Sequence, residues 1–124
     1  MAKNILVVDD DKDILTSVKM FLQMENYAVD VAENGKKALE LLEKKQYDLV
    51  VLDMLMPEMS GTDVAQKIRA NPKTKNQKIV FMTVITYSKQ LKHAVEALKP
   101  SAYIQIPIDI DNFKEIIKTL IGKS

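Results

Sequence analysis

The sequence predicts an α/β fold in which five parallel strands alternate with five helices. Short apolar runs of strand length alternate from end to end with stretches in which apolar residues recur at i, i+3, i+4 and i+7. Consecutive strand–helix units require parallel pairing, right-handed crossovers and helices on both faces of a doubly wound sheet. The apolar runs cover residues 5–8, 28–32, 49–52, 79–82 and 102–106, and the helical patterns cover 14–22, 38–42, 64–68, 91–98 and 113–121.

Apolar content and turn residues justify these elements in order along the chain. The first and third runs, 5–8 and 49–52, contain only apolar side chains, which is typical of strands covered on both faces. The remaining boundaries follow from breakers and caps. Asn34-Gly35 opens the second helix, Pro57 and Gly61 bracket the loop after the third strand, Asn71-Pro72 ends the third helix, and Asp109 or Asp111 caps the last.

The composition limits the chemistry that the chain can perform. With 124 residues, of which 47% are hydrophobic, we expect a single domain over residues 1–124 and no output domain. The lack of cysteine and the single histidine exclude disulfide scaffolds, thiolate nucleophiles and histidine metal clusters. A net charge of +1 does not favour nucleic-acid or membrane-surface binding, and the first apolar run is too short for a signal peptide. We therefore expect a cytoplasmic protein that works through carboxylates, hydroxyls and backbone groups.

Carboxylates gather at the carboxyl ends of two predicted strands. Asp9, Asp10 and Asp11 follow the first strand directly, and Asp53 follows the third. If the strand order is the flavodoxin-like 2-1-3-4-5, these strands are neighbours at the edge where ligands bind, and Asp9, Asp10 and Asp53 converge. Three adjacent carboxylates repel one another, so the cluster requires protons or a cation. Mg²⁺ prefers such oxygen ligands at neutral pH.

Each acidic residue also has a purely structural interpretation. Asp11 can cap the following helix, and Asp53 by itself can be a turn residue. A calcium-binding EF-hand loop that begins at Asp9 is excluded, because Ile14 stands where glycine is needed and Met20 where glutamate is needed. The joint placement of the acidic residues is therefore what favours a metal site.

Three segments carry a resemblance to a known family. They are Ile5-Leu-Val-Val-Asp-Asp-Asp11, Leu49-Val-Val-Leu-Asp-Met-Leu-Met-Pro-Glu-Met-Ser-Gly61 and Val80-Phe-Met-Thr83. Over essentially the whole chain, the sequence resembles the receiver domains of two-component response regulators, most closely the stand-alone chemotaxis type. The resemblance implies a flavodoxin-like five-stranded sheet of order 2-1-3-4-5. It also implies a phosphorelay signalling domain that is no enzyme beyond its own autocatalytic phosphorylation and dephosphorylation.

The resemblance assigns roles to the acidic residues and to one hydroxyl. Asp53 would be the phosphoacceptor and a ligand of Mg²⁺. Asp10 would bind the metal directly, Asp9 through water, and Leu55 through its backbone carbonyl. Thr83 would bring its hydroxyl to a phosphoryl oxygen. Physical chemistry agrees with these roles, because a carboxylate that attacks a phosphoryl group meets like charge, which a metal ion neutralises.

The resemblance further implies a switch and a set of partners. Tyr103 on the fifth strand would alternate between inward packing and outward exposure, biased by Thr83. The fourth helix, fifth strand and fifth helix would form the face that binds a downstream protein. The phosphoryl donor would be a sensor histidine kinase or a phosphotransfer protein, and the chain would be a monomer or a weak dimer.

The sequence departs from the family at two positions. The family ordinarily ends its fifth strand with Lys-Pro, whereas Ile106 precedes Pro107 here. A lysine ammonium roughly 3 Å from a phosphoryl oxygen gains about 5 kcal/mol of gross attraction at an effective dielectric of about 20, which isoleucine does not supply. Val84 follows Thr83 directly, where most receivers carry alanine or glycine. We therefore expect slow phosphorylation and dephosphorylation, or weak coupling to the switch.

Two other functions stay open at this point. A pseudo-receiver that signals without phosphate would keep the same fold; Ile106 favours it, whereas the retained acidic residues and Thr83 argue against it. A haloacid-dehalogenase-like phosphatase also uses an aspartate nucleophile and Mg²⁺. Its Asp-x-Asp-x-Thr/Val motif is not matched, because Asp13 occupies the fifth place.

Overall fold

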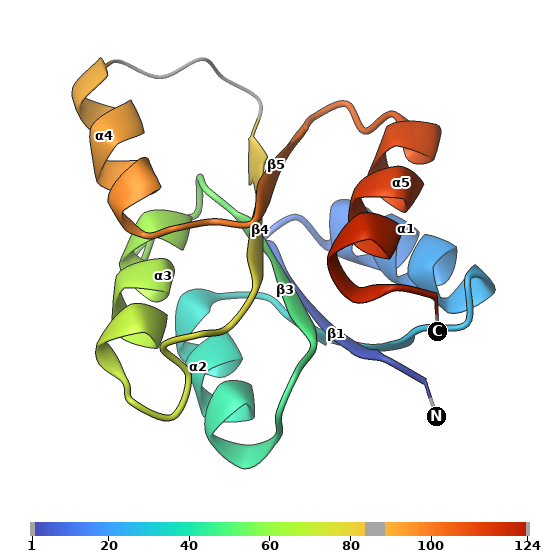
Figure 1. Cartoon of the computed structure of the whole chain (residues 1–124), viewed down its shortest axis with the longest axis horizontal. Coiled ribbons are helices and arrows are strands. Elements are labelled where there is room, and N and C mark those ends of the chain that lie inside the picture. The colour runs from blue at the N-terminus through green and yellow to red at the C-terminus, as the bar shows by residue number, and fades with distance from the viewer. Residues whose placement is uncertain (1, 84–88, 124) are drawn as a thin grey trace.

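A computed structural model describes residues 2–83 and 89–123, and in it five parallel strands form one sheet between two layers of helices (Figure 1). The strand order is β2-β1-β3-β4-β5, as predicted. The elements follow one another as β1 (Asn4–Val8), α1 (Lys12–Met24), β2 (Ala28–Ala32), α2 (Gly35–Lys44), β3 (Leu49–Asp53), α3 (Gly61–Ala70), β4 (Ile79–Thr83), α4 (Lys89–Ala97), β5 (Ala102–Gln105) and α5 (Ile110–Ile121).

The helices divide between the two faces of the sheet. Figure 1 shows α1 and α5 together on one side and α2, α3 and α4 on the other. Side chains alternate along the central strands, so each face has its own apolar cluster. Leu6, Leu52 and Phe81 pack with the layer of α2, α3 and α4, whereas Val7 and Met82 pack with α1 and α5. The continuous apolar runs of β1 and β3 therefore reflect burial on both faces, as the sequence predicts.

Side-chain caps begin four of the helices. The carboxylate of Asp11 accepts hydrogen bonds from the first turn of α1, so the structural role open to Asp11 is confirmed. Asn34 caps α2, Ser60 caps α3 through a capping box, and Asp109 rather than Asp111 caps α5. The cap residues thus hold the amino ends of α1 and α3 next to the carboxyl ends of β1 and β3.

Four strand boundaries differ by one residue from the predicted runs: β1 begins at Asn4, β3 and β4 end at Asp53 and Thr83, and β5 ends early. The predicted fifth strand runs to residue 106, whereas β5 ends at Gln105. Ile106 still donates its N–H to the carbonyl oxygen of Thr83 at 2.8 Å, and the Ile106–Pro107 peptide bond is cis. Since Pro107 has no N–H, regular pairing cannot continue past this residue. Ile106 therefore lies directly after the strand and beside the end of β4.

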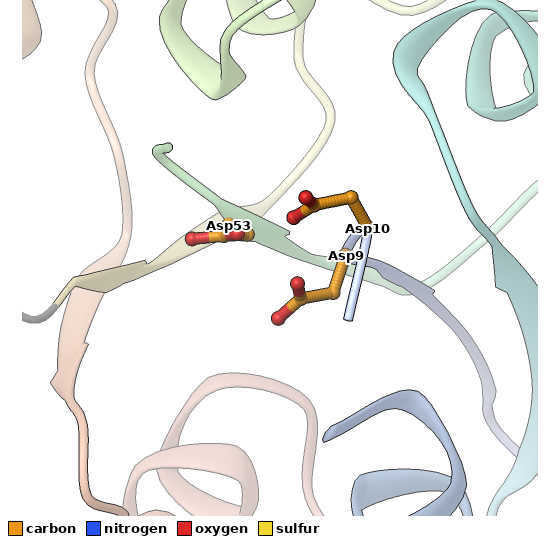
Figure 2. A group of neighbouring side chains, drawn as sticks. All are labelled: Asp9, Asp10 and Asp53. Atoms are coloured by element: carbon orange, nitrogen blue, oxygen red, sulfur yellow. The ribbon is translucent and has the colours of Figure 1, made fainter. Parts of the chain in front are cut away.

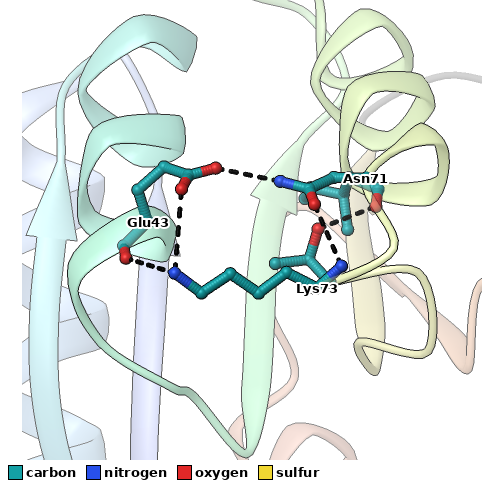
Figure 3. Close-up of polar contacts among 5 residues, drawn as sticks. Glu43, Asn71 and Lys73 are labelled. Carbon is teal, nitrogen blue, oxygen red and sulfur yellow. Dashed lines mark hydrogen bonds and ion pairs between the residues drawn. The ribbon is translucent and has the colours of Figure 1, made fainter.

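Polar contacts connect helices and loops at the amino ends of the strands, away from the acidic residues at the carboxyl ends. The Asn71 amide donates to Oε1 of Glu43 at 2.9 Å, and the Lys73 ammonium donates to the Glu43 carbonyl oxygen at 2.8 Å, which ties the end of α2 to the turn after α3 (Figure 3). Arg69 donates to four carbonyl oxygens, those of Leu98, Lys75, Gln77 and Lys99. These contacts satisfy carbonyls in the last turn of α2, directly after α4 and in the loop between α3 and β4.

The helices are short. The longest, α1, has 13 residues, whereas a membrane span needs about 20. Within residues 2–83 and 89–123, no helix combines the length and the apolar character needed to cross a membrane.

Candidate functional site

The pairing of β1 with β3 brings the predicted acidic residues together. Val8 lies beside Leu52 in the parallel register, so Asp9 and Asp10 emerge from one strand next to Asp53 at the end of its neighbour. Each of these three carboxylates offers an oxygen within 4.8 Å of the others. Figure 2 shows the three side chains turned toward a common space. The predicted convergence of Asp9, Asp10 and Asp53 is therefore what the structure contains.

Asp9 is the buried member of the group. Its side chain is 1% exposed, and its Oδ1 accepts the N–H of Asp11 at 2.9 Å. Its Oδ2 is buried and has no hydrogen-bond partner within the described part of the chain. Burial raises the pKa of Asp9 from 3.8 to about 7; the Asp11 N–H opposes this shift, and the charge of Asp53 adds to it. The buried Oδ2 is an acceptor that a cation would satisfy.

Asp53 is half-buried and Asp10 is exposed. Burial raises the pKa of Asp53, and the backbone N–H of Leu55, which donates to Oδ1 at 3.2 Å, opposes the rise. The nearby charge of Asp10 raises it further. Asp53 is thus partly accessible to solvent, and the N–H of Leu55 holds its carboxylate in one orientation.

The residues present fit a hard divalent cation. Three carboxylates supply only oxygen atoms, and they repel one another unless a proton or a metal ion lies among them. Mg²⁺ is bound in proteins by one or two carboxylates while water or a phosphate oxygen completes its shell. The site is both charged and open to a ligand. It contains one half-buried carboxylate, one exposed carboxylate and one buried oxygen to which no group in residues 2–83 and 89–123 donates.

Gly61 allows the loop after β3 to close against Asp53. A Cβ atom at residue 61 would lie 2.1 Å from the carbonyl oxygen of Asp53 and 2.9 Å from Cα of Met54. The N–H of Gly61 donates to the Met54 carbonyl at 3.1 Å. Because the atoms in the way are backbone, any larger residue here has to move the end of β3. Gly61 therefore determines where the Asp53 backbone lies.

The other predicted residues lie along the same edge of the sheet. Met82 pairs with Asp53, so Thr83 comes one residue later on the adjacent strand and is half-buried. Tyr103 is 37% exposed, and its ring lies 6.4 Å from that of Phe81. The side chain of Ile106 is partly buried against the apolar cluster on the α1 and α5 side. Val84 lies outside the residues that the structure describes.

Comparison with known proteins agrees with the fold. Residues 5–118 match the model of the family described as "Response regulator receiver domain". The chain belongs to this family. The transcriptional regulatory protein CrdR of Helicobacter pylori is 34% identical over 95% of this chain and 54% of its own length. This receiver thus spans about half the length of such curated relatives.

Solved structures of similar proteins are also receivers. The chemotaxis protein CheY4 of Vibrio cholerae superposes with a TM-score of 0.90 at 25% identity, over 97% of this chain and 99% of that one. The receiver domain of the sensor histidine kinase PA1611 of Pseudomonas aeruginosa, solved with magnesium in its active-site cleft, has a TM-score of 0.87 at 22% identity and covers 99% and 100%. The family match over residues 5–118 makes the chain a receiver domain of two-component signalling rather than a member of a catalytic enzyme family, so the phosphatase alternative is not favoured.

Two residues help to form the receiver's site in ways that were not predicted from the sequence. The backbone N–H of Asp11 orients Asp9, although Asp11 was expected only as a helix cap. Gly61 was expected only as a loop boundary, and its contact with Asp53 becomes visible when the loop closes. A glycine eight residues after a candidate nucleophile is the only sequence signal for this contact.

We expect the metal-free receiver to lose stability as the pH rises from about 4 to about 7. Unfolded Asp9 ionises near its ordinary pKa of 3.8, whereas folded Asp9 keeps its proton until about pH 7. Over this interval the folded state binds more protons, so the free energy of unfolding falls with pH and then levels off. Urea titrations with a chelator present, compared between wild type and Asp9→Asn, isolate the contribution of Asp9. Equal pH dependence in the two proteins would contradict the shifted pKa.

We expect Gly61→Ala to lower the free energy of unfolding by about 1–3 kcal/mol, because the new methyl group displaces backbone. Gly35→Ala is the matched control at the first residue of α2. There the nearest atoms are the side chains of Val64, at 2.6 Å, and Met59, at 2.7 Å, which can turn aside more easily than backbone. Urea denaturation measures both, and a smaller loss for Gly61 than for Gly35 would show that the close backbone approach does not matter.

Proposed function

We propose that Asp53 accepts a phosphoryl group from a sensor histidine kinase or a phosphotransfer protein, and that this switches a partner-binding face. The observation that carries the proposal is the convergence of Asp9, Asp10 and Asp53 around one buried carboxylate oxygen that has no donor within the described residues. Asp53 suits the role of nucleophile because it is half-buried and open to solvent, whereas Asp9 is enclosed.

The reaction requires only the transfer of one group. A carboxylate oxygen of Asp53 forms a bond to phosphorus, and the bond from phosphorus to the donor nitrogen breaks, with its electron pair left on the donor imidazole. The product is an acyl phosphate. Water can later attack the same phosphorus and restore the carboxylate. The Leu55 N–H, 3.2 Å from Oδ1 of Asp53, holds the attacking group in one orientation.

We assign the metal ligands to the same cluster. Asp10 and Asp53 would hold Mg²⁺ directly, Asp9 would hold it through water, and Leu55 would contribute its backbone carbonyl. When bound, the ion would neutralise charge on the attacking carboxylate and on the incoming phosphoryl group. The magnesium in the cleft of the PA1611 receiver domain supports the choice of metal. The oxygen-only donor set supports it independently.

We propose that the signal leaves through Thr83 and Tyr103. Thr83 ends β4 beside the strand of Asp53, so its hydroxyl can approach a phosphoryl oxygen. Tyr103 lies on β5, where its ring contacts Phe81 while more than a third of the residue stays exposed. This intermediate exposure supports a side chain that can move further in or further out. The downstream protein would bind the face formed by α4, β5 and α5, and the receiver would act as a monomer or a weak dimer.

Ile106 makes the phosphorylated state less stable than it would be with lysine. Its side chain lies against apolar residues of the α1 and α5 layer and carries no charge toward the acidic edge. A phosphoryl group on Asp53 therefore adds negative charge to a cluster that already holds Asp9 and Asp10, and residue 106 contributes no positive charge to offset it. This supports slow phosphoryl transfer rather than a phosphate-independent module, because Asp9, Asp10, Asp53 and Thr83 are all retained.

Incubation with Mg²⁺ and acetyl phosphate should add one phosphoryl group to the wild-type chain, because a small acyl phosphate can replace the protein donor. Intact-mass spectrometry measures the addition, and Asp53→Asn should stay unmodified. A chelator should abolish the reaction in the wild-type protein. If the wild-type mass stays unchanged at saturating donor, the phosphate-independent pseudo-receiver is correct instead.

Ile106→Lys should accelerate phosphorylation by about tenfold, equal to about 1.4 kcal/mol of transition-state stabilisation, since most of the gross attraction is offset by desolvation. Ile108→Lys is the matched control, because it places the same charge two residues further along a loop that packs against the same cluster. Rates come from the intact-mass time course. If both lysine variants change the rate equally, the effect of residue 106 is one of general charge and not of position.

A further inference from the structure

The amino ends of β4 and β5 border a basic hollow in the surface. It has a volume of about 510 Å³, which is within the range of small-molecule sites. One wall is the loop from α3 to β4, residues 71–78, and the other is the turn from α4 to β5, residues 98–101. Among the described residues that line the hollow, every charged side chain is basic: Arg69, Lys75, Lys78 and Lys99.

The sequence concentrates basic residues in this part of the chain. Residues 64–83 contain five lysine or arginine residues and no aspartate or glutamate, although the net charge of the whole chain is only +1. The acidic cluster lies at the carboxyl ends of β1 and β3, and all strands of the sheet are parallel. The basic hollow is therefore at the opposite end of the strands from the acidic cluster.

Arg69 connects the two walls of the hollow. Its Nε donates to the Leu98 carbonyl at 2.7 Å and its Nη2 to the Lys99 carbonyl at 3.2 Å, both in the turn after α4. Its Nη1 donates to the carbonyls of Lys75, at 3.0 Å, and Gln77, at 2.7 Å, in the opposite loop. One guanidinium thus fixes the separation of the walls, so a ligand does not have to order them when it binds.

The positive charge of the hollow is not balanced by carboxylates. Within residues 2–83 and 89–123, none of its four cations forms an ion pair. The carboxyl ends of α3 and α4 lie beside it, and Lys78 donates to the Leu120 carbonyl near the end of α5 at 2.6 Å. Each helix end contributes about half a negative charge, so a net charge of roughly +2 to +3 remains. Lys75 and Lys99, one on each wall, are exposed.

Lys99 has a backbone conformation that lysine rarely adopts. Its φ is 54°, in the left-handed region, two residues after the end of α4. Glycine or asparagine commonly occupies this place at the end of a helix, because other side chains are strained there. A positive charge is therefore present on the hollow at a position where the local backbone favours glycine.

We propose that the basic hollow binds an oligophosphate, through the triphosphate chain that inorganic tripolyphosphate and nucleoside triphosphates share. The ammonium groups of Lys75 and Lys99 contact the chain from the two walls, and the Asn76 amide and the Ser101 hydroxyl donate to its other oxygens. A chain is favoured over a single phosphate because the cations lie on both walls. No aromatic side chain among the described lining residues offers a surface on which a base could stack, so the phosphates are the recognised part.

This binding is separate from phosphoryl transfer to Asp53, because the two sites lie at opposite ends of the strands. NMR titration of the full chain with inorganic tripolyphosphate, with a chelator present and at low salt, tests it. We expect saturable shifts of the backbone amide signals of residues 75–78 and 97–101, while the signals of residues 9–11 and 53–55 stay in place. No saturable binding, or shifts that do not include the first two segments, would overturn the proposal.

Two further ligands identify the recognised group. Adenosine triphosphate should bind as well as tripolyphosphate; tighter binding of one of them would identify the nucleotide or the inorganic chain as the better source of the same group. Inorganic phosphate should bind at least about fivefold more weakly, because it carries fewer charges. Equal affinity for inorganic phosphate would overturn the assignment of a chain. Equal affinity for a peptide of six glutamates would show that the hollow recognises acidic protein segments instead.

Lysine variants test the position of the charges. Lys75→Gln and Lys99→Gln should each weaken tripolyphosphate binding about threefold, as expected for the loss of one exposed ion pair. Lys67→Gln is the matched control, since this exposed lysine lies on α3 outside the hollow. Equal weakening in all three variants would show an effect of net charge alone and overturn the site.

Lys99→Gly separates binding from folding. Because glycine adopts a positive φ without strain, this variant should unfold at a higher urea concentration than wild type. It should nevertheless bind tripolyphosphate about threefold more weakly, because the ammonium is lost. Unchanged or tighter binding in Lys99→Gly would exclude Lys99 from the site and overturn the proposed contact from both walls.

Discussion

The carboxylates of Asp9, Asp10 and Asp53 repel one another, and keeping them close together is the constraint that the rest of the structure has to meet. Their oxygens lie within 4.8 Å of one another, a separation that isolated side chains in water would not keep. Parallel pairing of two fully buried strands enforces it, because β1 and β3 can shift only by losing their packing on both faces. The fold therefore favours the binding of a cation or a proton among the three carboxylates, because either one reduces their repulsion.

Apolar burial and backbone contacts supply the rigidity that this cluster requires. Gly61 brings the start of α3 against the carbonyl of Asp53, and the Asp11 N–H orients Asp9. At the opposite edge of the sheet, Arg69 satisfies carbonyls from several loops at once. These contacts connect the strands to the loops at both ends of the sheet. Ile106, which stands where the family ordinarily carries lysine, supplies no positive charge to the cluster.

Most of the fold was predictable from local signals. The alternation of strand-length runs with helical spacing indicated all ten elements. Asp11 and Asn34 were expected at the starts of α1 and α2, and Asp109 was one of two candidates for α5, whereas Ser60 was not expected to cap α3. The fifth strand was predicted one residue too long, because Ile106 is apolar and only the following proline ends the pairing. The acidic residues of the candidate site could be predicted from the sequence, because their residue type and their place at the ends of strands were enough to identify them. The roles of Gly61 and of the Asp11 N–H could not be predicted, because both are backbone contacts and the type of side chain at a position says little about them.

The sequence by itself determined the element order, the two-sided burial of β1 and β3, and the presence of carboxylates at strand ends, because periodicity and residue type are local properties. Only the tertiary structure decided how deeply each carboxylate is buried and which groups donate to it. It buries Asp9 and leaves one of its oxygens without a donor among the described residues, and it half-buries Asp53 and exposes Asp10. It also decided that β2 lies at an open edge beneath Met20, since solvation and neighbours depend on which strands pair and which helix covers them.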